Sequence, residues 1–222
     1  MTSWERRIER AAELEQRVPA AADILRFYIA LGQALWPAAL NSEQVRQLIT
    51  RRGPPLLAEA ARNHAEPAES FIARVLRHAE AVEAAARSRI LVGQAVPPAN
   101  RGAAHTCPFC GERPVAAVLR PEGEGGKRYL LCSLCLTEWE FRRMLCPNCG
   151  EENHEKLAVY TTTEFPHIRV EACDSCRQYI KAIDLTVDGR AVPEVDELAS
   201  VALDLWGVEN GYTKLAANLF EL

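Results

Sequence analysis

Eight cysteines, arranged as four Cys-x-x-Cys pairs, constrain this chain of 222 residues more than any other feature of its sequence. None lies in the first 106 residues, and they occur as Cys107/Cys110, Cys132/Cys135, Cys146/Cys149 and Cys173/Cys176. Gaps of 21, 10 and 23 residues separate successive pairs, so a brief connector joins two four-cysteine units. One isolated pair could be a disulfide, a redox motif or half of a metal site, but two such units indicate metal binding.

An internal repeat supports the division into two units. The segment CPFCGERPVAAVL opens the first unit and CPNCGEENHEKLAVY opens the second, with 39 residues from Cys107 to Cys146. In each unit an apolar alternating segment follows the first cysteine pair, and another leads into the second pair. This pattern predicts a small antiparallel hairpin with a cysteine turn, or knuckle, at each end.

Two knuckles brought together by a hairpin can form a tetrahedral cage of four thiolates around one metal ion. Pro108 and Pro147 stiffen the first knuckle of each unit, and Gly111 and Gly150 can take the positive φ that ends it. The expected ligands are Cys107, Cys110, Cys132 and Cys135 in one cage, and Cys146, Cys149, Cys173 and Cys176 in the other. Four sulfur ligands suit zinc or rubredoxin-type iron, and ligand counting leaves that choice open.

The histidines are not needed as ligands, because eight cysteines already fill two cages. His105 and His154 lie near knuckles and are interpreted as exposed loop residues, whereas His64 and His78 are expected on helix surfaces. A thioredoxin-like redox role is disfavoured, since no βαβ pattern surrounds any of the cysteine pairs. No catalytic constellation is evident, so the sequence does not predict an enzyme.

The rest of the chain predicts an α+β protein: an N-terminal α-helical domain, two tandem rubredoxin-like or zinc-ribbon units and a C-terminal helix. Residues 1–92 show apolar positions at helical spacing, and residues 93–106, rich in Pro, Gly and Ala, predict a linker. Residues 107–145 and 146–192 are the first and second metal ribbons. Residues 193–222 are the C-terminal helix and tail.

Several helix ends can be placed from the sequence. Ser42 is expected to cap the helix that contains EQVRQLI. After the second ribbon, one amphipathic helix is expected from Pro193 through Trp206, ended by Gly207 or Gly211. Its apolar face should pack on the metal ribbons, while the final ten residues look free to bind a partner.

Composition and charge restrict the class of protein. No run of eighteen apolar residues is present, and the first residues lack the apolar core of a signal peptide, so we expect a cytoplasmic protein without membrane insertion. In that compartment cysteine clusters more often bind metal than pair as disulfides. Residues 105–222 hold 12 Lys and Arg against 19 Asp and Glu, a net charge of −7, which argues against a nucleic-acid partner.

The arrangement CPFCG…LLCSLCLTEWEFRRMLCPNCG…EACDSCRQYIKAIDL closely resembles the formate dehydrogenase accessory protein (FdhE) family. The resemblance covers Cys107 to Asp184 and continues from Pro193 to Gly211. It implies a cytoplasmic, non-enzymatic factor that supports maturation of respiratory formate dehydrogenases and contacts their catalytic subunit. In that family the paired motifs are associated with rubredoxin-like iron, which would place a metal ion on each set of four cysteines named above.

The sequence departs from the rubredoxin pattern at the second knuckle of each unit, where Leu136 and Arg177 replace the glycine that follows the cysteines. Zinc therefore stays an alternative to iron. The leading hypothesis is a maturation factor that binds its client through the metal ribbons and the acidic tail. The alternatives are a zinc-ribbon adaptor in a nucleic-acid-handling complex and a small rubredoxin-like electron-transfer protein.

Overall fold

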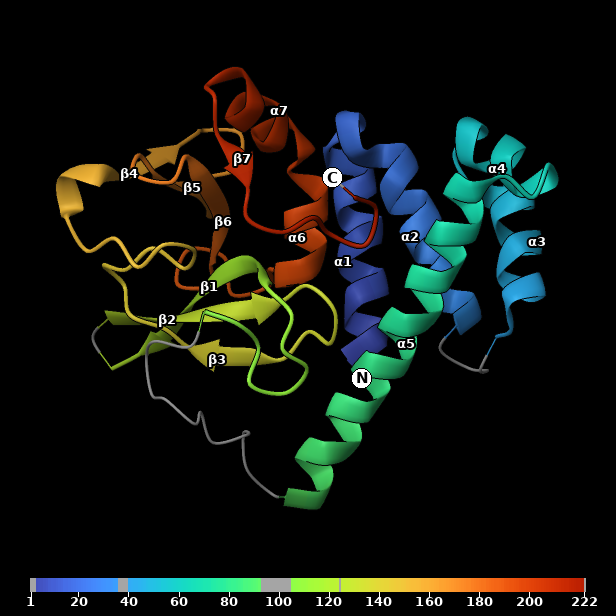
Figure 1. Ribbon diagram of the computed structural model, residues 1–222, viewed down its shortest axis with the longest axis horizontal. Coiled ribbons are helices and arrows are strands. Elements are labelled where there is room, and N and C mark those ends of the chain that lie inside the picture. Colours follow the sequence, from blue (N-terminus) through green and yellow to red (C-terminus); the bar gives the residue numbers. More distant parts are fainter. Residues whose placement is uncertain (1–2, 36–39, 93–104, 124, 222) are drawn as a thin grey trace.

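The computed structural model describes residues 3–35, 40–92, 105–123 and 125–221, and it confirms the predicted α+β class. A helical half and a half built on one β-sheet lie side by side (Figure 1). The helical half contains α1 (Ser3–Arg17), α2 (Ala22–Leu35), α3 (Ser42–Arg52), α4 (Pro55–Arg62) and α5 (Glu66–Val92). Of the predicted linker, residues 93–104 lie outside the described residues.

The start of α3 corrects one expectation. Asn41, rather than Ser42, is the N-cap: its side chain accepts a hydrogen bond from the Gln44 backbone N–H, and the Gln44 side chain accepts one from the Asn41 N–H. This reciprocal capping box satisfies two backbone donors that the helix itself cannot pair. Ser42 is the first residue inside the helix.

Each four-cysteine unit forms an antiparallel hairpin extended by a third strand. In the first unit β1 pairs with β2 and β2 with β3; in the second β4 pairs with β5 and β5 with β6. The strands are β1 (Pro114–Glu122), β2 (Gly125–Cys132), β3 (Glu138–Glu140), β4 (Leu157–Thr161), β5 (Ile168–Cys173) and β6 (Gln178–Asp184). Both predicted hairpins are therefore present.

The two units are not separate ribbons, because β1 of the first pairs in parallel with β6 of the second. The resulting strand order is β3-β2-β1-β6-β5-β4, one sheet with the two units laid side by side. A short strand β7 (Thr213–Lys214) pairs in parallel with the first two residues of β6. The hydrophobic pattern predicts each hairpin, but it does not specify which strands pair between hairpins.

The sheet has an apolar layer on each face. On one face Ala116, Val118 and Ile183 pack with residues of α1 and of α6 (Pro193–Ala199), so α6 lies between the sheet and α1 (Figure 1). On the other face Leu119 and Leu130 pack with Trp139, with cysteines of the first four-cysteine unit and with α5. The helical half has a further core of its own, formed by α2, α3, α4 and α5.

The C-terminal region differs from the single helix and free tail that the sequence suggests. The chain forms two helices, α6 and α7 (Val201–Glu209), which meet at Ser200, and Gly207 lies inside α7. The tail then crosses to the helical half, where Phe220 packs edge-on against Phe27 with ring centroids 6.0 Å apart. The curving red tail beside α1 and α2 is visible in Figure 1. The tail therefore packs against the helical half and is not free to bind a partner as the sequence suggests.

A buried ionic cluster fixes α6 to α1 and to the sheet. Arg10 of α1 is 3% exposed and donates to both carboxylate oxygens of Asp196, at 2.5 and 3.0 Å. His167, just before β5, donates to the same carboxylate from Nε2 at 2.8 Å. Asp196 also accepts the backbone N–H of Val192, so its charge is fully engaged inside the protein.

A second buried cluster joins β6 and β7 to α6 and α7. Lys181 of β6 is fully buried and lies 2.9 Å from a Glu197 carboxylate oxygen and 2.7 Å from one of Asp204. Lys214 of β7 pairs with the same two carboxylates. Tyr179 donates its hydroxyl to Asp204 at 2.8 Å. Two lysines and two carboxylates thus balance each other in a largely buried site.

Candidate metal centres

The structure brings the eight cysteines together in two groups of four, as the repeat suggests. We call them site 1 (Cys107, Cys110, Cys132 and Cys135) and site 2 (Cys146, Cys149, Cys173 and Cys176). Within each group every sulfur lies within 4.8 Å of the others. Each site takes one knuckle from before its hairpin and one from the hairpin's far end, where the two come together in space.

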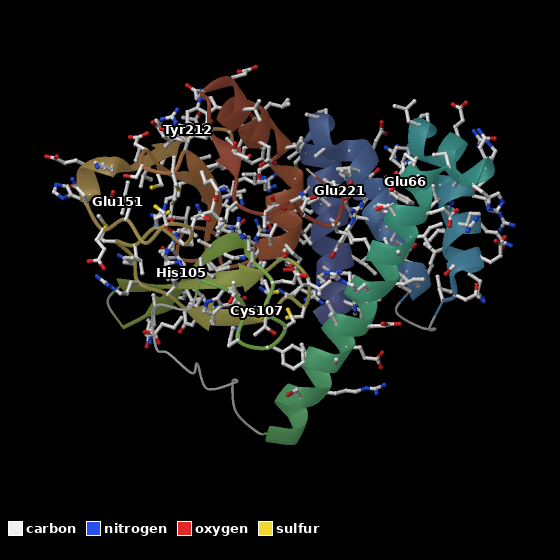
Figure 2. The ribbon with its side chains drawn as sticks, viewed as in Figure 1. Glu66, His105, Cys107, Glu151, Tyr212 and Glu221 are labelled. Carbon is white, nitrogen blue, oxygen red and sulfur yellow. The ribbon has the colours of Figure 1, made fainter. Side chains whose placement is uncertain are left out.

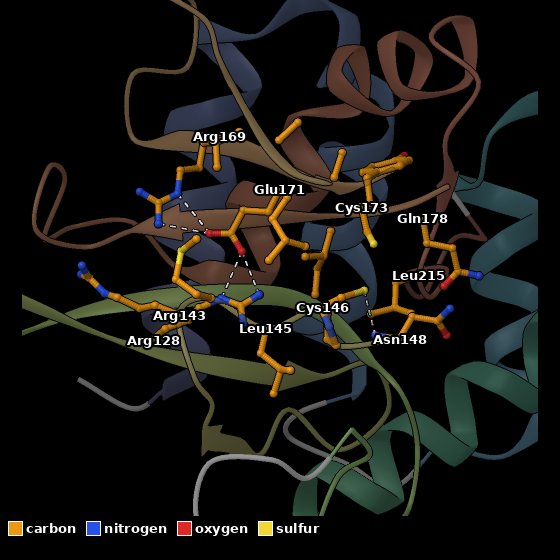
Figure 3. Close-up of a pocket in the computed structure, with 18 residues that line it drawn as sticks. Arg128, Arg143, Leu145, Cys146, Asn148, Arg169, Glu171, Cys173, Gln178 and Leu215 are labelled. Carbon is orange, nitrogen blue, oxygen red and sulfur yellow. Dashed lines mark hydrogen bonds and ion pairs between the residues drawn. The ribbon is translucent and has the colours of Figure 1, made fainter. Parts of the chain in front are cut away.

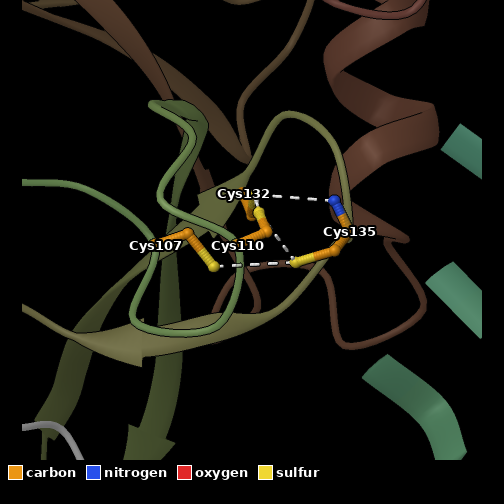
Figure 4. Close-up of side chains that lie close together, drawn as sticks. All are labelled: Cys107, Cys110, Cys132 and Cys135. Atoms are coloured by element: carbon orange, nitrogen blue, oxygen red, sulfur yellow. Dashed lines mark hydrogen bonds between the residues drawn. The ribbon is translucent and has the colours of Figure 1, made fainter. Parts of the chain in front are cut away.

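The sulfur spacing fits a tetrahedral metal ion. In site 1 the Cys107–Cys135 and Cys110–Cys132 sulfurs are 3.6 and 3.4 Å apart (Figure 4). In site 2 the Cys146–Cys176 and Cys149–Cys173 sulfurs are 3.8 and 3.7 Å apart. A tetrahedron with metal–sulfur bonds of about 2.3 Å has sulfur–sulfur edges of about 3.8 Å. The donor set and its dimensions therefore suit zinc or iron equally.

All four knuckles use the same backbone turn. Gly111 and Gly150 take positive φ values of 81° and 75° after the first knuckle of each unit, as expected. Leu136 and Arg177 follow the second knuckles with φ values of 54° and 56°. This region is uncommon for residues with a Cβ, so the turn is retained at a conformational cost where glycine is missing.

The knuckle backbone directs N–H groups at the sulfurs, which favours the thiolate form. The N–H groups of Phe109 and Leu134 lie 3.4 Å from the sulfurs of Cys107 and Cys132, and Asn148 N–H lies 3.4 Å from that of Cys146. Such donors stabilise negative charge on a ligand sulfur and fix its direction.

Four thiols packed this closely cannot all ionise independently. Hydrogen bonds from the thiols of Cys132 and Cys135 lower the pKa of Cys107. Hydrogen bonds with Cys107 and Cys135, together with burial, raise the pKa of Cys132. In site 2 burial raises the pKa of Cys173. A metal cation removes this conflict, because its charge stabilises all four thiolates at once.

The surroundings of the two sites differ. Site 1 lies in the apolar layer with Trp139, Phe141 and Ala85 of α5. Site 2 lies at the other end of the sheet half, beside a cavity of about 210 Å³ that Cys146 and Cys173 help to line (Figure 3).

His105 connects the two units. Its Nδ1–H donates to the Pro147 carbonyl at 2.9 Å, and its ring packs edge-on against Phe141. His154 is exposed, as expected, in a short 3₁₀ turn. His78 contradicts the expectation of a surface position: it is 8% exposed, and burial lowers its pKa to about 4. Its position on α5 faces the sheet half, which a helical period alone cannot reveal.

Sequence reasoning missed the two buried ionic clusters. One signal was available: Lys181 interrupts the apolar run YIKAI, and a charged residue inside a buried strand requires a buried partner. Its partners lie on α6 and α7, elements whose packing the sequence alone does not specify. Within the described residues, no helix has both the length and the apolar character required to cross a membrane.

Comparisons with known proteins follow the same division of the chain. The family model described as FdhE, central domain matches residues 106–143, and the one described as FdhE, C-terminal domain matches residues 144–221. Together they cover more than half of the chain.

Individual relatives agree with these matches. A protein of Aquifex aeolicus named Protein FdhE homolog is 42% identical over 113 residues, which are 50% of this chain and 40% of that protein. A Pseudomonas aeruginosa protein of the same name is 41% identical over 120 residues, 51% of this chain and 38% of that protein. The matched stretch thus spans about 40% of the length of these curated relatives.

A solved structure matches over nearly the whole chain. The crystal structure of the FdhE protein from Pseudomonas aeruginosa aligns with a TM-score of 0.68 and 28% sequence identity. The alignment covers 98% of this chain and 95% of that chain, and so includes the helical half, which lies outside the two family-model matches given above.

Proposed function

This chain belongs to the FdhE family, and on that premise we propose that it is a metal-binding accessory factor for the maturation or activation of formate dehydrogenase. We propose that it acts in the cytoplasm by binding the catalytic subunit of that enzyme and has no catalytic activity of its own. The observation that carries the proposal is the pair of four-sulfur sites, because both are built within residues matched by the FdhE models.

In the proposed holoprotein the cysteines of site 1 and site 2 each bind one ion, iron or zinc. A bound ion supplies a structural crosslink between the two knuckles of a unit, and with iron it also supplies a one-electron centre. The chain's own contribution is to orient the sulfurs, through the knuckle N–H groups and the parallel β1–β6 pairing that joins the units.

Three of the five acidic residues of α6 and α7 are not suited to bind a client. Asp196 and Glu197 are each 1% exposed and Asp204 is 8% exposed, and all three are paired inside the protein. We therefore propose that the client binds to a surface that does not include these three acidic residues.

We place it on the exposed apolar residues of β4 and α7. Val159 of β4 is 56% exposed, and Leu205 and Val208 of α7 are 63% and 69% exposed. A groove lined by Tyr160 and Trp206 lies between these elements, and their rings pack with centroids 4.5 Å apart. An exposed apolar patch beside a groove is typical of a protein–protein interface.

The test is capture of a tagged formate dehydrogenase catalytic subunit by the full-length chain. The double substitution Leu205→Glu and Val208→Glu should reduce capture by at least about tenfold, which is the effect of about 1.4 kcal/mol. The control is Leu56→Glu, which alters an 83% exposed leucine on α4 in the helical half and should leave capture unchanged.

Two different results would reject parts of the proposal. If the wild-type chain captures no catalytic subunit, the proposed client is wrong. If Leu56→Glu abolishes capture and the α7 variant does not, the client surface lies on the helical half. Metal analysis of protein purified from its native host identifies the ion, since ferric thiolate sites absorb visible light and zinc sites are colourless.

A further inference from the structure

The two four-sulfur sites differ in their access to solvent. In site 1 three cysteines are 3% exposed or less, namely Cys107, Cys132 and Cys135. In site 2 Cys149 is exposed and Cys176 is partly exposed. A metal ion leaves a thiolate cage through steps in which one sulfur dissociates and an incoming ligand takes its place, so we expect faster exchange at the site that solvent reaches more readily.

Site 1 is enclosed by the rest of the fold. Its cysteines share an apolar cluster with Trp139, Phe141 and Leu130, and Ala85 of α5 packs against the same cluster. Figure 2 shows Cys107 close to α5, whereas Glu151, which follows the first knuckle of site 2, lies at the opposite end of the sheet half. The Cys135 sulfur also contacts the Thr137 hydroxyl at 3.2 Å, an additional side-chain hydrogen bond inside the enclosed site.

Site 2 has a cavity beside it instead of a helix. The cavity of about 210 Å³ is lined by Cys146 and Cys173, by apolar side chains including Met144 and Leu157, and by a group of charged residues (Figure 3). It is large enough to admit a small chelating molecule to the sulfurs. Met144 is 50% exposed, so the cavity adjoins the surface.

The charged residues that line the cavity favour the entry of an anionic ligand. Arg128 and Arg169 both donate to Glu171, one to each carboxylate oxygen, so that a single negative charge serves two guanidinium groups. Arg143 is exposed and also lines the cavity, where its side chain donates to the Gly126 carbonyl at 2.5 Å. Three positive charges and one negative charge therefore line the cavity that an anionic ligand must cross to reach the sulfurs.

We propose that site 2 is the exchangeable metal site of this protein and that anionic metal-binding ligands reach it through the arginine-lined cavity. Site 1 is the retained, structural site. This division rests on the proposed binding of one metal ion by each site, and it assigns the exchangeable ion to the end of the sheet half that carries β4.

The experiment starts from full-length protein loaded with two zinc ions. EDTA is added, zinc release is followed over time, and free thiols are alkylated with iodoacetamide and mapped by peptide mass spectrometry. We expect two phases with rates that differ by at least about tenfold, the lower end of the effect that surrounding groups have on metal sites. The fast phase should expose Cys146, Cys149, Cys173 and Cys176 to alkylation before any cysteine of site 1.

A variant tests the role of the cavity separately. Arg143→Ser should slow the fast phase with EDTA and leave it unchanged with the neutral chelator 1,10-phenanthroline. The matched control is Arg142→Ser, because Arg142 is the adjacent exposed arginine, pairs with Glu152 and does not line the cavity. An equal effect of both variants would overturn the cavity route.

The outcomes separate this inference from the function on which it rests. Protein that binds no zinc or iron overturns both. Protein that binds two ions and releases them in one phase, or exposes the cysteines of site 1 first, overturns only the assignment of site 2 as exchangeable.

Discussion

Lys181 offers the sharpest test of what holds the sheet to the C-terminal helices. Its Nζ is fully buried and lies within 2.9 Å of three acceptors: the Glu197 carboxylate, the Glu197 carbonyl and the Asp204 carboxylate. Lys181→Met keeps the length of the side chain but removes its charge and all of its donors. Of the two lysines that balance these carboxylates, Lys214 then remains.

Breaking a buried pair by removing one partner costs about 3–5 kcal/mol, because the remaining charge is left without compensation. With a urea m-value of about 2 kcal/mol/M, the unfolding midpoint should fall by about 1.5–2.5 M. The assay is urea denaturation of the metal-loaded protein, followed by tryptophan fluorescence. Adding Asp204→Asn removes the excess negative charge, so the double variant should recover part of the loss.

The matched control is Lys127→Met. Lys127 also lies on a strand and pairs with Glu122 and Glu140, but its side chain is 34% exposed, so its loss should leave the midpoint nearly unchanged. If Lys181→Met lowers the midpoint no more than Lys127→Met does, the buried cluster does not stabilise the fold and the reasoning is wrong.

Three further predictions concern the same region. Gly207→Ala should cost about 1–3 kcal/mol, because the added Cβ would lie 2.7 Å from the buried Tyr179 ring, whereas Gly189→Ala, with its nearest atom at 3.8 Å, should leave the urea midpoint unchanged. The pKa of Asp196 is lowered, since hydrogen bonds from its histidine and arginine partners outweigh the opposing effect of burial. Its contribution is therefore present above pH of about 4 and is lost as the pH falls through the lowered value; an acid titration of Asp196→Asn should show a smaller loss than the wild type. Phe220→Ala should lower the thermal midpoint, because its ring fills space between two phenylalanines of the helical core; an unchanged midpoint would show that the tail is dispensable.

Cysteine spacing was enough to predict the local chemistry and the local fold of the second half. The repeat separates the eight sulfurs into the two groups that the structure brings together, and alternation predicts a hairpin in each unit. Both signals are local, because each hairpin closes within about forty residues of its own sequence. Gly111 and Gly150 predict a turn with positive φ because glycine adopts this conformation readily. Leu136 and Arg177 adopt the same turn, which their residue types do not predict.

The long-range arrangement could not be predicted from the sequence for a physical reason. Parallel pairing of β1 with β6 joins segments whose alternating patterns are satisfied equally well in separate hairpins. Residues such as Arg10 and His167 have patterns compatible with exposure, and only their joint contact with Asp196 makes burial favourable. The number of Asp and Glu residues likewise cannot distinguish an exposed carboxylate from one that is buried and neutralised by a basic side chain.

The Arg10–Asp196 pair has a consequence for synthesis on the ribosome. The two residues are 186 positions apart, so at about 5–20 residues per second roughly 10–40 s pass between the addition of one and of the other. During that time α1 carries an arginine whose buried partner does not yet exist, and its apolar face lacks α6 and the sheet. The apolar surface of the helices that faces α6 and the sheet therefore stays uncovered until the half with the four-cysteine sites has been synthesised and has folded.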